Sequence, residues 1–323
     1  MGYAAKILCD SISPAGHRLV SVEWTFPRFI LAEVNTHRML SKSSASSRAV
    51  PVGKRLAMIR EEPFMPAVFG KNQKGMQAGA LLDEAENAAA QNLWNDAMQA
   101  AIGFAEKFAE LGVHKQYANR LTELFSWHTA VVTGTEWENF EALRINPAAQ
   151  PEFYQAAVVL RDAKAASTPL LLKQGEWHLP YVQPDERNGD WRKLVRLSCA
   201  RAARVSYLTQ DGVRDLDADL GLYARLASMG HMAPLEHAAR PMTDLELEEA
   251  EMHEFVLHGS VLERGDAQDG LSVVRTRAGA QYRACRKLEI VSERTVYFCG
   301  NFNGWVQHRK ELPGEAIFGT APR

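Results

Sequence analysis

The chain has 323 residues, of which 46% are hydrophobic and 24% are charged, a composition typical of globular proteins. Its formal net charge of -2 argues against a nucleic-acid-binding protein, because such proteins usually carry an excess of basic residues. The four cysteines form no C-x-x-C pair, so neither a zinc ribbon nor a redox pair is indicated, and they suit a reducing cytoplasm. We see no signal peptide and no membrane-spanning segment, so we expect a cytoplasmic protein without a membrane partner.

The first half of the chain combines predicted strands and helices. Residues 5–9 and 19–26 are predicted strands, since apolar residues alternate in the second and Pro27 ends it. Residues 28–40 have the apolar spacing of a helix. Proline and glycine predict an irregular loop over 50–76. Three further helices are predicted, over 77–112, 115–126 and 151–166.

The second half is less regular. Residues 167–195 are predicted to be a connection that contains proline and tryptophan, and 196–208 begin a second block. Residues 217–230 form an amphipathic pattern that ends at Gly230. Beyond it, 243–270 predict a helix and a surface loop, and 271–299 predict strands that pair.

The densest chemical signal is the segment 36–48, THRMLSKSSASSR. Five serines fall within seven residues, bracketed by Arg38 and Arg48. Hydroxyl groups, backbone amides and guanidinium forks are what a phosphate monoester needs, because arginine gives bidentate charge-assisted hydrogen bonds. A solvated serine-rich loop is the alternative, since serine is common in loops. The position directly after an apolar helix favours a phosphate site.

At this segment the chain resembles the flavin-dependent thymidylate synthases, the ThyX family. Members share R-H-R, then seven residues and Ser, usually followed by one residue and Arg. Here His37 and Arg38 are followed by seven residues and Ser46, with Arg48 two positions on. The chain departs from the family pattern at three positions of this motif: Thr36, Ser43 and Ser44.

A second block of the family lies downstream, as a helix ending in A-R and then a segment with Asn, Phe and Arg ending near A-Q-x-E. This chain resembles it at Arg120, at Asn139 and Arg144, and at Gln150 with Glu152. The spacing from Asn139 to Arg144 and on to Gln150 is similar to that of the family.

A third block is similar but stands in a different order. Family members usually begin with A-R-x-S and G-H-x-S-P-F-E-H, whereas here the matching segments 203–206 and 230–237 follow the R-H-R motif. Phage-type members carry this permuted order and a closing segment that resembles 300–313. The order predicts that His237 and the pair His37–Arg38 border one cavity, and that 19–26 pair in the sheet near the segment just after His237.

The resemblance implies an α+β fold, an antiparallel sheet flanked by long helices, and a homotetramer with sites built between subunits. It implies one ThyX-like catalytic domain over 1–323, in which 243–295 is a possible insertion of unknown role. Its phage-type order implies the cytoplasm of a bacterium or of a phage-infected host.

The activity that the resemblance implies is methylation of dUMP to dTMP with FAD, NADPH and methylenetetrahydrofolate. The expected flavin-binding residues are His37, Arg38, Asn139 and His237, with Ser206 as a further candidate. The expected dUMP-binding residues are Ser46, Arg48, Arg120 and Arg144. Among these, Arg48 and Arg120 suit the phosphate, and Arg144 suits the pyrimidine edge, where a cation stabilises developing negative charge. Ser46 is expected to position the substrate, since no base stands near it at a triad-like spacing.

Other functions remain open. One is a pyrimidine nucleotide hydroxymethylase on the same scaffold, and another is a nucleotide-binding homologue without catalysis, to which the departures at 36, 43 and 44 point. A nucleic-acid-binding module is more distant, for lack of basic excess. The segment 253–258, HEFVLH, does not predict a zinc helix, because its second histidine stands at i+5 and not at i+4. We therefore predict no metal site.

Overall fold

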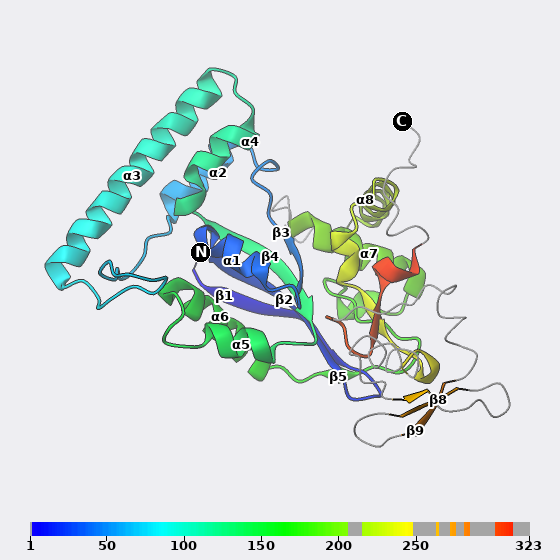
Figure 1. The fold of residues 1–323 in the computed structure, drawn as a ribbon. Coiled ribbons are helices and arrows are strands. Elements are labelled where there is room, and N and C mark those ends of the chain that lie inside the picture. Colours follow the sequence, from blue (N-terminus) through cyan, green and yellow to red (C-terminus); the bar gives the residue numbers. More distant parts are fainter. Residues whose placement is uncertain are drawn as a thin grey trace.

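The computed structural model describes residues 2–205, 215–247 and 301–312, and three short strands within 263–284 (Figure 1). At its centre lies a five-stranded sheet of order β3-β4-β2-β1-β5. Its strands are β1 (Ala4–Ile12), β2 (Arg18–Pro27), β3 (Ser41–Ser44), β4 (Trp127–Gly134) and β5 (Leu170–Leu171). All neighbours are antiparallel except β1 and β5, which are parallel. The predicted class is confirmed: a mainly antiparallel sheet with helices around it.

One face of this sheet is apolar. Alternate residues of β2 point toward it, namely Val20, Val22, Trp24 and Phe26, and none of the four is exposed. The helices α5 (Glu138–Arg144) and α6 (Pro151–Ala165) cover this face (Figure 1). The Trp24 indole nitrogen donates to the Ala156 carbonyl oxygen at 2.9 Å. Since side chains alternate between the two faces of a strand, every second residue of β2 enters one continuous core, as the alternation in 19–26 predicts.

The opposite face of the sheet is polar. Buried hydroxyl groups from four adjacent strands lie on it: Ser11, Ser21, Thr133 and Ser43. The side chains that meet these hydroxyls come from the second half of the chain, His178 in the connection and His237 after η5 (Ala233–Glu236). The second half therefore closes the polar face.

Beyond one end of the sheet, α3 (Glu84–Glu110) stands as a long helix that projects from the body (Figure 1). The helix predicted over 77–112 is confirmed, but it begins later, because Asp83 and Glu86 form a capping box. Under it lies α2 (Val52–Glu61), whose Leu56 and Ile59 pack in a cluster with α3. The irregular loop predicted over 50–76 is therefore wrong for α2, because the apolar spacing outweighs the prolines and glycines around it.

The segment after β2 differs in part from the prediction. The helix expected over 28–40 is shorter, with η1 (Arg28–Ile30) followed by α1 (Leu31–Thr36). It ends there because His37 has φ −77° and ψ 84°, outside the helical region, and the chain then extends into β3. Residues 115–126 form α4 (Lys115–Ala118) and η2 (Asn119–Phe125).

The second half contains α7 (Trp191–Arg204) and α8 (Leu216–Ser228), which pack together. Buried Arg201 joins them through Asp219 at 2.9 Å, and it also pairs with Glu186 of η3 (Pro184–Glu186). None of the helices in the described ranges is long and apolar enough to cross a membrane.

The segment after His237 forms β6 (Ala239–Pro241), which pairs with β10 (Trp305–Gln307) in a separate two-stranded sheet. Both edges of β2 are occupied by β1 and β4. Strand β2 thus pairs in the central sheet and not with this segment, but it lies near it as predicted, since Leu19 of β2 and Ala239 of β6 pack in one hydrophobic cluster. After β10 comes η6 (His308–Glu311).

Within the range 243–295, the structure describes a small antiparallel sheet of order β7-β8-β9. Its strands are β7 (Glu263–Arg264), β8 (Ser272–Arg275) and β9 (Gln281–Ala284). The pairing of β8 with β9 confirms paired strands within 271–299. The segment 253–258 lies outside the described residues.

Candidate functional site

The short edge strand β3 organises the residues singled out in the sequence. It is held against β4, with Ser41 opposite Thr133 and Ser44 opposite Ala130. His37 and Arg38 precede the strand, and Ser46 and Arg48 follow it. Since a strand advances about 3.3 Å per residue, the ends of β3 lie about 10 Å apart. The strand thus separates two groups of polar side chains.

The group after β3 belongs to the loop 45–50. The Ser46 hydroxyl accepts from the Arg48 backbone amide at 3.3 Å, and the Arg48 guanidinium is exposed with no partner among the described residues. Arg120, also exposed and unpaired within the described chain, follows Asn119, whose amide binds the loop carbonyls of Ser47 and Val50 at 2.7 and 2.8 Å. The structure therefore brings Ser46, Arg48 and Arg120 to one small region.

The group before β3 centres on His37 and Arg144. The Arg144 Nε donates to His37 Nε2 at 2.8 Å, and its guanidinium lies over the Phe153 ring, 4.2 Å from the centroid. Burial, together with the positive charges of Arg144 and Lys42, lowers the pKa of His37 to about 4. The imidazole is neutral near pH 7, with its proton on Nδ1, because Nε2 accepts from Arg144.

Two further predicted residues lie exposed near this group. Asn139 is in the first turn of α5 and Arg144 in its last turn, so one short helix carries both. The side chains of Arg38 and Asn139 have no hydrogen-bond partner in the part of the chain that the structure describes. The candidate Ser206 lies outside the described residues.

His237 lies against the middle of β3 and is fully buried. Its Nε2 contacts the Ser43 hydroxyl at 3.0 Å, and its Nδ1 contacts the Thr133 hydroxyl at 2.8 Å. Burial, and then the nearby His178, lower the pKa of His237 to about 3. Both ring nitrogens are therefore occupied in this arrangement, and the imidazole is neutral.

The contact to His237 is one end of a buried chain of hydrogen bonds across the sheet. Thr133 contacts the Ser21 hydroxyl at 2.6 Å, Ser21 contacts His178 Nε2 at 2.8 Å, and His178 Nδ1 contacts Ser11 at 2.9 Å. Ser11, Ser21 and His178 were not singled out in the sequence. A usable signal was a hydroxyl residue inside an otherwise apolar strand, such as Ser21 in LVSVEWTF.

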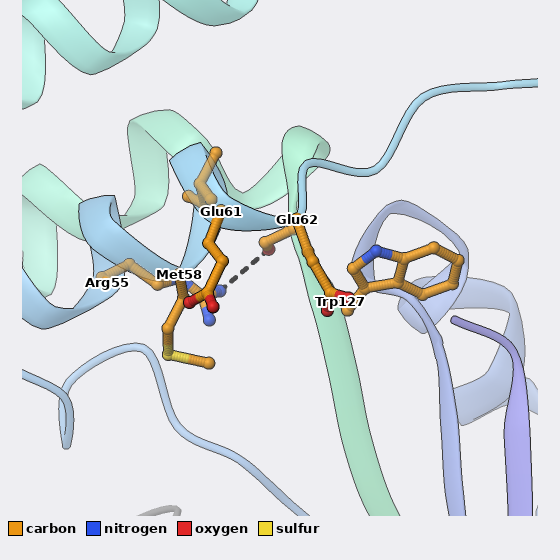
Figure 2. Close-up of a pocket in the computed structure, with 7 residues that line it drawn as sticks. Arg55, Met58, Glu61, Glu62 and Trp127 are labelled. Atoms are coloured by element: carbon orange, nitrogen blue, oxygen red, sulfur yellow. Dashed lines mark hydrogen bonds between the residues drawn. The ribbon is translucent and has the colours of Figure 1, made fainter. Parts of the chain in front are cut away.

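A cavity of about 80 Å³ lies elsewhere, between the end of α2 and the start of β4 (Figure 2). Arg55, Met58, Glu61, Glu62 and Trp127 line it, together with Ile59 and Ser126. Arg55 is buried and donates to the Ser126 hydroxyl at 2.9 Å. No residue singled out in the sequence lines this cavity, so it is separate from the groups around β3.

Comparisons with known proteins add the following findings. The family model described as thymidylate synthase complementing protein matches residues 10–170. Among solved structures, one is described as a UMP/dUMP methylase, PolB, from Streptomyces cacaoi bound with 5-Br UMP. It is similar with a TM-score of 0.43 and 13% sequence identity, over 52% of this chain and 90% of that chain. No curated protein matches the chain.

The matched range takes in β2, β3 and β4 of the five-stranded sheet, both groups around β3, and the loop 45–50. It also includes the two blocks on which the sequence resemblance first rested, whereas His237 lies beyond it. The resemblance is confirmed: residues 10–170 of the chain match the thymidylate synthase complementing protein family.

Proposed function

We propose that the chain is a flavin-dependent thymidylate synthase that converts dUMP to dTMP with FAD, NADPH and methylenetetrahydrofolate. In this reaction the hydrogen on uracil C5 is replaced by a methyl group, whose carbon comes from the folate and whose two reducing electrons come from NADPH. The observation that carries the proposal is the gathering of Ser46, Arg48 and Arg120 on the loop after β3, inside the range that matches the family.

The substrate phosphate is assigned to this loop. Arg48 and Arg120 are cations without a partner among the described residues, and the Ser46 hydroxyl has its proton available to donate. A charge-assisted hydrogen bond to phosphate contributes on the order of 1.5–3 kcal/mol. Two arginines and a hydroxyl therefore suit a phosphate dianion.

The uracil ring is assigned to Arg144. Its Nε is occupied by His37, so its two terminal nitrogens remain to face the ring oxygens of a pyrimidine. Because His37 is neutral, it orients the guanidinium without neutralising it. A cation fixed in this way stabilises the negative charge that develops on the ring when C5 reacts.

The flavin is assigned to the surface beside this group. Arg38, Asn139 and the His37 Nδ1 proton are polar groups that suit a dinucleotide cofactor, whereas His237 must release Ser43 or Thr133 before it can contact one. When bound, FAD supplies the hydride chemistry between NADPH and the one-carbon unit. The proposal includes the homotetramer that the family resemblance implies, in which a second copy completes each site. We extend the proposal to one catalytic domain over 1–323, with 243–295 as an insertion.

The test begins with the visible absorbance spectrum of the purified protein, with and without added FAD. A flavin spectrum, followed by conversion of dUMP to a product heavier by one methyl group, is the expected result. A product carrying a hydroxymethyl group identifies a hydroxymethylase instead. A colourless protein that binds dUMP but takes up no FAD contradicts the synthase and identifies a nucleotide-binding homologue.

Two variants separate the assigned roles. Arg48→Ala is expected to weaken dUMP binding at least tenfold and to leave FAD binding within twofold, because it removes a phosphate contact. Equal losses for both ligands mean that Arg48 is only structural. Ser46→Ala is expected to keep measurable turnover, and complete loss of turnover with dUMP affinity intact contradicts a positioning role for Ser46.

A further inference from the structure

Four backbone carbonyls of the loop 45–50 accept hydrogen bonds from side chains outside the loop. Arg28 Nη1 donates to the Ala45 carbonyl at 3.1 Å, and Lys115 Nζ donates to the Ala49 carbonyl at 3.1 Å. Asn119 holds two more, because its amide donates to the carbonyls of Ser47 and Val50. Within the loop, Ser46 accepts from the Ala49 amide at 3.0 Å.

The donors are themselves fixed. Arg28 also contacts His128 Nδ1 at 2.7 Å and pairs with Glu123 at 3.1 Å, so its fork has one orientation. Glu123 in turn accepts from the Ser47 hydroxyl. Asn119 is fully buried, and both hydrogens of its amide are engaged with the loop. The positions of the Ala45, Ser47, Ala49 and Val50 carbonyls are therefore set by side chains outside the loop.

Because the peptide bond is planar, the fixed carbonyls also set the directions of the neighbouring amide groups. In a trans peptide, the carbonyl of one residue and the N–H of the next point in opposite directions. Since the Ala45 and Ser47 carbonyls point toward their donors, the N–H groups of Ser46 and Arg48 point away from them. The Ser46 amide has no acceptor among the described residues, and the Arg48 amide bonds only to the Ser46 hydroxyl.

We propose that Arg28, Lys115 and Asn119 are positioning residues that shape the loop 45–50 into a receptor for a phosphate monoester. They withdraw the partial negative charge of the carbonyls, which repels a dianion, and they present the amides of the two residues whose side chains also suit phosphate, Ser46 and Arg48. The inference rests on the proposed function, because it names the part of that site that recognises the phosphate of dUMP.

The test uses the full-length protein and the variant Lys115→Met, which keeps the length of the side chain and removes its donor. Lys54→Met is the matched control, since Lys54 is an exposed lysine on the neighbouring helix α2 with no partner among the described residues. Binding of dUMP and of deoxyuridine, which lacks the phosphate, is measured by calorimetry. Lys115→Met is expected to weaken dUMP binding about five- to tenfold and to leave deoxyuridine binding within twofold. The separate variant Lys115→Arg, which keeps a donor, is expected to bind dUMP as the wild type does.

A second variant, Arg28→Lys, keeps the charge but cannot hold Ala45, His128 and Glu123 at once, and the same selective loss of dUMP affinity is expected. Both variants binding dUMP as the wild type does, or losing dUMP and deoxyuridine equally, overturns the inference. Titration with inorganic phosphate distinguishes a failure of this inference from a failure of the proposed function. A wild-type protein that binds phosphate but not dUMP contradicts the synthase, and the variants then test the loop alone. A wild-type protein that binds neither overturns both.

Discussion

Both faces of the central sheet contain buried side chains, but the two faces are held by different means. On one face, Trp24 and its apolar neighbours meet α5 and α6 over a broad area. On the other, the hydroxyls of Ser21 and Thr133 make individual hydrogen bonds with the imidazoles of His178 and His237. Apolar contact is non-directional and scales with area, whereas a buried hydroxyl needs a partner at one place. The first face tolerates small shifts of its cover, and the second fixes where the second half of the chain lies.

The largest expected effect comes from the apolar face. Trp24→Ala should destabilise the protein by about 3–5 kcal/mol, because it removes a fully buried ring and leaves a cavity. Urea unfolding followed by circular dichroism measures the loss. Trp191→Ala is the control, since Trp191 is 43% exposed and should cost less. A loss below 1 kcal/mol for Trp24→Ala contradicts the view that this face is the main core.

On the polar face, His237→Phe should cost about 2–4 kcal/mol, although it keeps a ring in the same place. It leaves the Ser43 hydroxyl buried and unpaired, at about 1–3 kcal/mol, and it takes from the Thr133 hydroxyl one of its two partners. The same unfolding experiment measures it. If His237→Phe leaves the free energy of unfolding unchanged, the imidazole only fills space, as an apolar residue does on the other face.

Substitutions on the two faces should also differ in how they change the dependence of stability on pH. In the unfolded chain a histidine gains its proton below about pH 6.5, whereas the folded protein keeps His237 neutral until about pH 3. Between these values the unfolded state binds more protons, so stability falls as the pH falls, by roughly 1 kcal/mol per pH unit for this residue. His37, with a pKa of about 4, adds to the slope. Unfolding from pH 7 to 4.5 should show a shallower slope in His237→Phe and an unchanged slope in Trp24→Ala.

The smallest expected effect is the coupling within the polar chain. Thr133→Val removes a partner of both His237 and Ser21. When it is combined with His237→Phe, the second change should cost about 1 kcal/mol less than it does alone, because the hydroxyl that would lose a partner is already gone. A double-mutant cycle by urea unfolding measures this coupling free energy. Strict additivity means that the two residues do not share one hydrogen-bond chain.

The apolar face was predictable from sequence because alternation in 19–26 is a local property. The group at Ser46 and Arg48 was predictable because it lies within one segment of the motif. The frame around the loop was not, since Arg28, Lys115 and Asn119 act on backbone atoms, and nothing in their own neighbourhood in the sequence marks such a contact. His178 was missed for the same reason, because its partners Ser11 and Ser21 are more than 150 residues away.

The hydrogen-bond chain across the polar face has a direction. At 2.6 Å, Thr133 and Ser21 require a single proton between them, so one hydroxyl donates and the other accepts. If Thr133 donates, Ser21 is left to donate to His178 Nε2, and the Nδ1–H group of His237 donates to the Thr133 hydroxyl oxygen. If the order reverses, both rings carry their proton on Nε2. Two histidines 59 positions apart in the chain, on separate segments, therefore share one tautomeric state, and neither can change it without the other.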